Sequence, residues 1–358
     1  MTMDRTAPPS AEAQLTFLAK LQRLFAEGDF TATYKFALLI ALADLAVEQG
    51  RDDGRELMLT TRQIGERFIH LYWQQAAAYG TGRPGAESGV LVQNTGAQAA
   101  VVSAIVAFRR TMPAANPQVA AHHPAYQGLL RGVTQTVSAM PLNYLQNFGG
   151  DTDEFLYERV GPGQILLRPG VAFCLRRFQP LVQQLARSHW IGHLKGNRRN
   201  HAILGEADDL ERFLFETSRQ SLLKLAEGLR RIDGATCFYC GLGLAVPDVD
   251  HFIPFSQYPR DLAHNFVLAH PACNRSKSAM LGARRHLERW LERLARRSDD
   301  VAEVGAEAGL VVDVATCHRV ASWGYASARA GGASAWVASN TFEVVDASYT
   351  TCFDQDLN

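Results

Sequence analysis

The 358-residue sequence predicts a mainly α protein that carries one small α+β module, and three observations lead to this prediction. Apolar residues recur at intervals of three and four over much of the first 230 residues, which is the spacing of helices that pack on one another. Two apolar runs separated by Gly-Pro-Gly indicate a β-hairpin near residues 155–174. Between Cys237 and Met280, two cysteine-containing pairs enclose short β-prone runs, which predicts a compact metal-stabilised module.

The first domain is expected to be helical over most of residues 15–230, after a flexible N-terminus at residues 1–14. The run from Phe36 to Val47 is apolar but contains Asp44, so we interpret it as a buried helix and not as a membrane span. The sequence does not decide whether this domain serves recognition or regulation. The helices are predicted at residues 15–26, 34–48, 61–79, 96–108, 178–190 and about 208–230.

Four potential metal ligands have the same spacing at both ends of the module. Cys237 and Cys240 are separated by two residues, as are His270 and Cys273. Three thiolates and one imidazole form a closed tetrahedral site for Zn²⁺, so the ion is expected to be structural. The alternative is a group of cysteines with a redox or packing role.

A second group of polar residues lies between these ligands and consists of Asp250, His251, Asn265 and Asn274. A histidine has a pKa suited to activating water, and a carboxylate with a carboxamide suits Mg²⁺. His251 follows Asp250 directly in an apolar stretch that is typical of a strand end, where successive side chains point in opposite directions. One can therefore hold a metal while the other faces the attacking water.

The strings DHFIPFS, HNFVL and CNRSKS make this segment, about 45 of the 358 residues, resemble the HNH endonucleases. The resemblance implies a ββα-metal fold, with strands near residues 249–253 and 266–269 and a helix from about Pro271. It also implies that His251 is the general base, that Asp250 and Asn274 bind catalytic Mg²⁺ or Mn²⁺, and that Asn265 holds the base in position. Asn274 stands where other members carry a histidine.

A basic segment follows the motif. From Arg275 to Arg297 there are eight basic and two acidic residues, a local balance of 8 − 2 = +6. The sequence predicts a nuclease module at 231–282 followed by a basic amphipathic helix at 283–298. The whole chain has 36 basic and 36 acidic residues, so affinity for DNA must be local. Lys277 suits either a phosphate contact or a solvated helix face. The expected DNA contacts are Arg275, Lys277, Arg284, Arg285 and Arg289.

Residues 299–358 form a small, β-prone C-terminal region with expected strands at 311–320, 335–339 and 342–345. This region would complete the helical domain, shield the module or bind a partner, and its residues do not decide among these roles. Three cysteines outside the zinc ligands, without a disulfide-like pattern, favour a cytoplasmic protein, and neither a signal peptide nor a membrane span is expected.

The predicted function is metal-dependent hydrolysis of DNA, double-stranded by preference, by an HNH endonuclease. The resemblance favours a role in bacterial antiviral defence or restriction, with a protein partner from a multi-gene system. Two alternatives remain open: a non-enzymatic zinc-stabilised nucleic-acid-binding protein, and an RNA nuclease or structure-specific repair nuclease. The sequence sets no oligomeric state.

Overall fold

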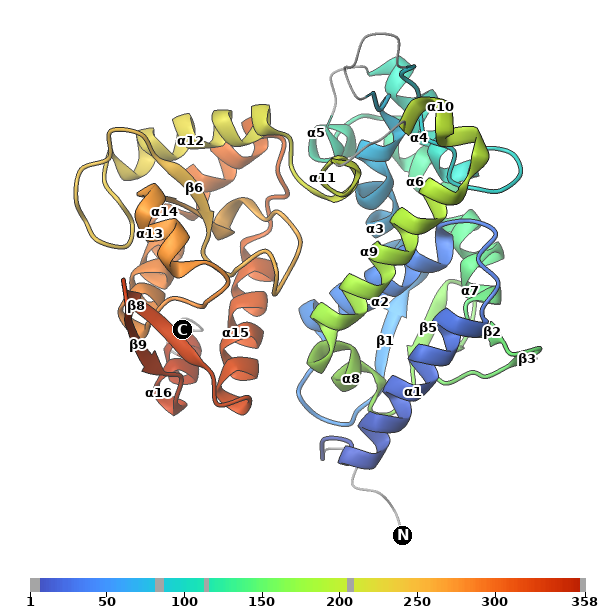
Figure 1. Cartoon of the computed structure of the whole chain (residues 1–358), viewed down its shortest axis with the longest axis horizontal. Coiled ribbons are helices and arrows are strands. Elements are labelled where there is room, and N and C mark those ends of the chain that lie inside the picture. The colour runs from blue at the N-terminus through green and yellow to red at the C-terminus, as the bar shows by residue number, and fades with distance from the viewer. Residues whose placement is uncertain (1–6, 81–86, 113–115, 205–208, 355–358) are drawn as a thin grey trace. The chain divides into compact units, whose positions relative to one another are not determined.

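The computed structural model describes residues 7–80, 87–112, 116–204 and 209–354 (Figure 1). It divides into a first unit, residues 1–215, and a second unit, residues 216–358. We expected the boundary at 230/231, but it lies earlier because helix α12 (Arg219–Asp233) packs on helix α14 (Arg284–Ala308) of the second unit. Of the expected flexible N-terminus, residues 1–6 lie outside the described residues, and helix α1 (Ala11–Glu27) already begins at Ala11.

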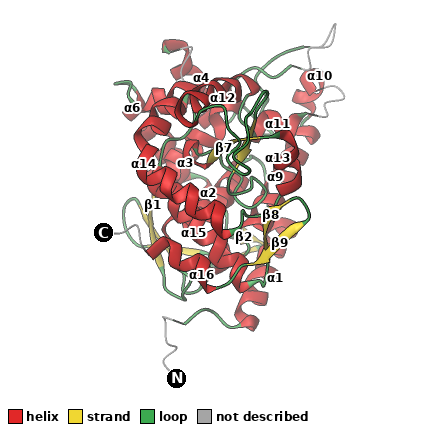
Figure 2. Cartoon of the chain, turned by 90° about the vertical axis from the view of Figure 1, so that its left-hand side faces the viewer, coloured by secondary structure: helices red, strands yellow, loops and turns green. Residues whose placement is uncertain are grey.

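The predicted mainly α fold is confirmed: helices predominate, and the strands form small antiparallel sheets (Figure 2). In the first unit, helix α2 (Tyr34–Gln49) is buried almost all round, as its apolar sequence requires. It packs on α3 (Thr61–Trp73), α8 (Val171–Arg177) and α9 (Gln179–Gly196). Its acidic residues are compensated: Asp44 accepts a hydrogen bond from Gln183 Nε2 at 2.7 Å, and Glu48 pairs with Arg67. Among the described residues, no helix is both long and apolar enough to span a bilayer.

Helix α3 (Thr61–Trp73) begins at a capping box, in which the Thr60 and Gln63 side chains each accept a hydrogen bond from the other's backbone N–H. It ends sooner than predicted and continues only as a 3₁₀ turn, η1 (Gln74–Ala76). The predicted hairpin is present as β4 (Tyr157–Arg159) and β5 (Gln164–Leu167). Gly161 and Gly163 in its turn have φ of 143° and 81°, conformations that favour glycine.

Strand β1 (Leu57–Thr60) pairs with the other edge of β5 and completes a three-stranded antiparallel sheet in the order β1-β5-β4. A second, two-stranded sheet joins β2 (Asn147–Phe148) to β3 (Asp151–Thr152). The remaining helical elements of the unit are α4 (Ala100–Thr111), α5 (Pro117–Ala121), α6 (Tyr126–Ala139), α7 (Pro141–Tyr144), α8 (Val171–Arg177), α9 (Gln179–Gly196), η2 (Arg198–Asn200), α10 (His201–Leu204) and α11 (Leu210–Phe215).

The second unit contains a strand-strand-helix arrangement at its centre. Strand β6 (Asp248–His251) pairs antiparallel with β7 (Phe266–Ala269), and helix α13 (Pro271–Lys277) follows directly, with Pro271 in its first turn. The loop between the strands ends in a short 3₁₀ helix, η3 (Ala263–Asn265). Helices α12 and α14 flank this arrangement (Figure 1). The predicted order of strand, strand and helix is therefore present, although β6 ends two residues earlier than expected.

The C-terminal region is more helical than predicted. The basic helix does not end at 298 but continues, with a kink at Arg297, to Ala308. Residues 311–320, expected to form a strand, lie mainly in helix α15 (Val314–Ala330). The expected strands further on are present as the hairpin β8 (Ser334–Ala338) and β9 (Thr341–Val344). The last described elements are α16 (Ala347–Thr350) and η4 (Thr351–Asp354).

Candidate metal centre and active site

The predicted metal ligands meet in one cluster, which we call the Cys/His cluster (Cys237, Cys240, His270 and Cys273). One ligand atom from each of the four residues lies within 4.8 Å of the others. A backbone turn orients the first two sulfurs, and in it the Gly241 N–H donates to Cys237 O at 2.9 Å. Gly241 has a φ of 74°, a conformation that favours glycine. The other two ligands flank the first turn of α13, where His270 is the N-cap residue. The cluster can therefore hold a metal ion such as Zn²⁺.

Hydrogen bonds orient the ligands of the Cys/His cluster. His270 Nε2 lies 3.0 Å from the carbonyl of Gly243, so it carries the proton and leaves Nδ1, 3.3 Å from Cys240 Sγ, for a metal. Burial raises the pKa of the Cys237 thiol, but backbone N–H groups of Cys240, His270 and Tyr239 outweigh it and lower that pKa to about 7. The backbone thus favours the thiolate at Cys237, whereas burial and the neighbouring sulfurs of Cys237 and Cys240 raise the pKa of Cys273 to about 12.

His251 ends strand β6 opposite Phe266, and its side chain is 23% exposed. The ring packs against Phe255 and Phe266. Nε2 lies 2.6 Å from Oδ1 of Asp261, in the loop after β6. Asp261 is itself held, because its Oδ2 accepts from the Thr217 backbone N–H at 3.1 Å. His251 is therefore fixed through one nitrogen, while the structure gives Nδ1 no hydrogen-bond partner among the described residues.

Asp250 points to the other face of β6, towards α13. Its Oδ2 accepts from Tyr239 Oη at 2.5 Å and pairs with Lys277 Nζ at 3.2 Å. Burial raises the pKa of Tyr239, and burial also lowers the pKa of Lys277 against the opposing effect of Asp250. Both contacts are made by one carboxylate oxygen, and within the described part of the chain Oδ1 has no protein partner. The carboxylate is held with one oxygen left to bind a ligand.

Asn274 lies on the face of α13 that meets β6. Its Nδ2 donates to Asp248 Oδ2 at 3.2 Å, so its carbonyl oxygen is left as a donor atom for a cation. Asn265 has a different position: its side chain accepts from Ile253 N at 2.7 Å and donates to Ile253 O at 2.9 Å. It therefore fixes the chain two residues after His251.

Other predicted contacts differ from expectation. Asp250 contacts α13 through Lys277, one turn from Asn274, whose own partner is Asp248. Lys277 is not at the surface: its side chain is 0% exposed, because it neutralises Asp250 and donates to His251 O at 2.8 Å. Its expected phosphate contact is therefore wrong for this conformation.

Arg275 is exposed on α13. Arg284 pairs with Glu288, Arg285 donates to Val337 O, and Arg289 donates to Phe238 O, so these three exposed arginines already have protein partners.

Three functional candidates were missed from sequence: Tyr239, Asp248 and Asp261. For Asp248 a signal existed, since it lies two residues before Asp250 and alternate residues of a strand share a face. Tyr239 lies between the first two cysteines, and their spacing fixes only the number of residues there and not which residues they are. Asp261 lies in a loop ten residues after His251, and no periodicity connects a loop residue to a strand end.

Comparison with known proteins concerns the other unit. The model of a family described as a domain of unknown function, DUF8808, matches residues 14–212, more than half of the chain. The chain belongs to the DUF8808 family. The DUF8808 segment lies within the first unit, and the Cys/His cluster and the residues around His251 follow it in sequence. No curated protein and no solved structure matches the chain.

A basic groove of about 560 Å³ lies beside the Cys/His cluster, between Phe238, Leu268 and helix α14. Arg293 binds Asp233 through Nε and Nη2, at 3.0 and 2.8 Å, while its buried Nη1 has no hydrogen-bond partner in the described part of the chain. The Arg289 guanidinium lies over the Phe238 ring, 5.8 Å from its centre. The groove is lined by four arginines and two acidic residues: Arg289, Arg293, Arg296, Arg297, Asp233 and Glu292.

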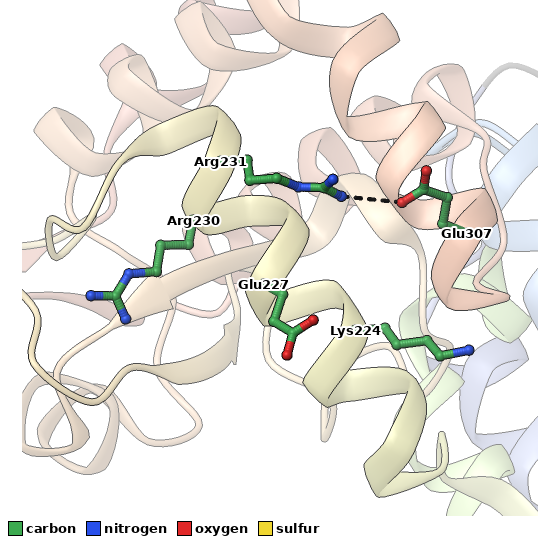
Figure 3. A pocket seen from close by; sticks show the side chains of 5 residues that line it. All are labelled: Lys224, Glu227, Arg230, Arg231 and Glu307. Atoms are coloured by element: carbon green, nitrogen blue, oxygen red, sulfur yellow. Dashed lines mark hydrogen bonds and ion pairs between the residues drawn. The ribbon is translucent and has the colours of Figure 1, made fainter.

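A second hollow, of about 590 Å³, lies between α12 and α14 (Figure 3). Its charges are mixed, and Arg231 is neutralised by Glu307 at 3.2 Å. Figure 3 shows that Arg230 points away from the other labelled side chains. These groups do not converge on a common point, so the hollow does not form a second candidate site.

Proposed function

We propose that the second unit is a metal-dependent HNH endonuclease that hydrolyses DNA. One observation carries the proposal: each of the three predicted active residues is oriented by its own polar partner. His251 is paired with Asp261, Asp250 with Tyr239 and Lys277, and Asn274 with Asp248. A scaffold that served only to bind nucleic acid would need none of these pairs.

The Cys/His cluster suits a structural Zn²⁺. Ligand atoms within 4.8 Å of one another fit the edges of a tetrahedron, which are roughly 3.8 Å for a Zn–S distance of about 2.3 Å. All four ligands come from the protein, so no position is left for water or substrate. The ion would connect the turn at Cys237 to the start of α13 and so stabilise the unit.

The polar layer between β6 and α13 suits a hard cation such as Mg²⁺ or Mn²⁺. Among the described residues, Oδ1 of Asp250 and the carbonyl oxygen of Asn274 have no hydrogen-bond partner, whereas the other polar atom of each side chain is held. Oxygen donors from one carboxylate and one amide leave the remaining positions to water and phosphate, as Mg²⁺ prefers. When bound, the ion supplies positive charge that neutralises the phosphate and the departing 3′ oxygen.

In this mechanism His251 takes a proton from a water molecule, whose oxygen forms a bond to phosphorus. The bond from phosphorus to the 3′ oxygen breaks, and that oxygen takes a proton from solvent. His251 then returns its proton to solvent. The products carry a 5′-phosphate and a 3′-hydroxyl, and one water is consumed for each bond cleaved.

The charge distribution supports a polyanionic substrate. The chain has no net charge, yet four arginines line the groove beside the Cys/His cluster, and Arg275 is exposed on α13. Arginines at a groove bind phosphates without reading sequence. The groove therefore replaces Lys277 as the proposed contact to the DNA backbone.

The test is to incubate the full chain with supercoiled plasmid, single-stranded DNA and RNA, with Mg²⁺ or with a chelator. We expect Mg²⁺-dependent plasmid cleavage that His251→Ala abolishes and that His122→Ala, at an exposed histidine of the first unit, leaves unchanged. Cleavage of RNA but not of DNA would show that the substrate is RNA and would contradict the proposed hydrolysis of DNA. Binding of plasmid without cleavage by the wild type would favour the non-enzymatic alternative.

A further inference from the structure

Asp261 is a second, mostly buried carboxylate beside the proposed general base. Neither the Cys/His cluster nor the polar layer between β6 and α13 uses it. Its side chain is 12% exposed and bridges two structures: Oδ1 contacts His251 Nε2 at 2.6 Å, and Oδ2 accepts from Thr217 N–H at 3.1 Å. Thr217 lies just before α12, whereas Asp261 lies in the loop between β6 and β7. The carboxylate is thus held from outside the strand that carries His251.

The geometry points to Asp261 as a positioning residue that sets the tautomer of His251, so that Nδ1 is the atom that accepts the proton of the attacking water. This inference rests on the proposed function. A carboxylate at 2.6 Å accepts only from a protonated Nε2, and a neutral imidazole with its proton on Nε2 has a lone pair on Nδ1. Among the described residues Nδ1 has no hydrogen-bond partner.

The same arrangement stabilises His251 in the protonated form that it takes during the reaction. When Nδ1 takes the proton, the ring becomes an imidazolium whose positive charge faces the Asp261 carboxylate. Asp261 stays ionised throughout; burial raises its pKa, but the His251 and Thr217 hydrogen bonds outweigh burial and lower it. The Phe255 and Phe266 rings that pack on the imidazole limit its rotation, so the carboxylate controls which nitrogen is available.

Asp261→Asn separates this role from a merely structural one. The backbone N–H of Thr217 needs an acceptor, so the amide would present its oxygen there and its NH₂ to His251 Nε2. An NH₂ donor at Nε2 forces the proton onto Nδ1 and removes the base. If Asp261 only fixed the loop, the near-isosteric Asp261→Asn would lower kcat slightly and Asp261→Ala would lower it more. If Asp261 sets the tautomer, Asp261→Asn lowers kcat at least as much as Asp261→Ala.

The experiment compares wild type, Asp261→Asn, Asp261→Ala and the control Asp29→Asn, an exposed residue of the first unit, in Mg²⁺-dependent plasmid cleavage at one pH. We expect Asp261→Asn to lower kcat between about 100- and 10,000-fold with KM unchanged, and the control to match wild type. In parallel, ¹⁵N spectra of histidine-labelled full chain, assigned with His251→Ala, report the tautomer. We expect the proton on Nε2 in wild type and on Nδ1 in Asp261→Asn.

Two results with an active wild type would overturn the inference and leave the proposed function intact. One is a wild-type kcat in Asp261→Asn, and the other is a His251 proton on Nδ1 in the wild-type protein. Absence of cleavage by the wild type would overturn the proposed function and the role of Asp261 with it. Zinc content and the thermal melting of each variant identify any that fails to fold. For such a variant the wild-type tautomer decides the question.

Discussion

At the scale of single residues, the proposed active groups of the second unit depend on partners that sequence spacing does not display. The four metal ligands were predictable because each pair is local and both pairs have the same spacing. Asp250, His251 and Asn274 were proposed from the HNH resemblance, and each has a polar partner in the structure. The partners Tyr239 and Asp261 were not, since they come from a turn and a loop whose positions the fold alone determines.

Lys277 illustrates how burial changes the expected role of a charged residue. A lysine one turn from Asn274 on a short helix was compatible with a phosphate contact, but Asp250 faces the same layer from β6. The pair lies away from solvent, where an unpaired charge is costly. The lysine therefore neutralises the proposed metal ligand and holds it in position.

Lys277→Met is expected to destabilise the second unit by about 3 kcal/mol or more, because it leaves the Asp250 carboxylate buried without its partner. The matched control is Arg275→Met, an exposed residue two positions earlier on the same helix, which should change stability by less than about 0.5 kcal/mol. Urea unfolding of the full chain, monitored through the release of bound zinc, measures the stability of both variants. Equal midpoints for the two variants would contradict the buried pair.

At the scale of elements, the helices with a clear three- and four-residue spacing were predictable, and α1, α2, α4 and α9 lie within a few residues of their expected bounds. Residues 311–320 were not, because their valines favour a strand locally. Here Asp313 caps the helix, accepting from Thr316 N at 2.8 Å, and Cys317, Val320 and Ala321 bury one face. Capping and packing together outweigh the intrinsic β preference of the valines.

The contact between α12 and α14 depends on Gly228. A Cβ at this position would lie 2.1 Å from Cγ1 of Val304, so the two helices approach closely only because Gly228 has no side chain. We expect Gly228→Ala to lower the melting temperature of the second unit, with a cost of about 1–3 kcal/mol. The control is Gly132→Ala, at an exposed position of α6, where no atom of the described residues lies within 4 Å of the added Cβ and alanine favours the helix. A rise in stability for Gly228→Ala would contradict this helix packing.

At the scale of the whole molecule, the chain joins a DUF8808 segment to a unit that contains the Cys/His cluster and the polar layer between β6 and α13. The sequence predicted the mainly helical fold and the strand-strand-helix order around His251. It did not predict that α12 belongs to the second unit, because an amphipathic helix does not show which neighbour it packs on.

Metal removal should act on one unit only. We expect Cys240→Ser to abolish stoichiometric zinc binding and to unfold the second unit, because the cluster joins the turn at Cys237 to α13. Cys352→Ser, outside the cluster, should retain zinc. Metal analysis and hydrogen exchange of the full chain report this, and the first unit should remain protected in both variants. Full zinc content in Cys240→Ser would contradict the assignment of the ligands.

Cleavage of supercoiled plasmid by zinc-loaded protein, with and without His251→Ala, tests the central claim most directly. The account predicts nicked or linear product that requires Mg²⁺ and is lost in His251→Ala, while zinc content and DNA affinity stay unchanged. Cleavage by His251→Ala at the wild-type rate, or no cleavage by zinc-loaded wild type with Mg²⁺ present, would contradict it.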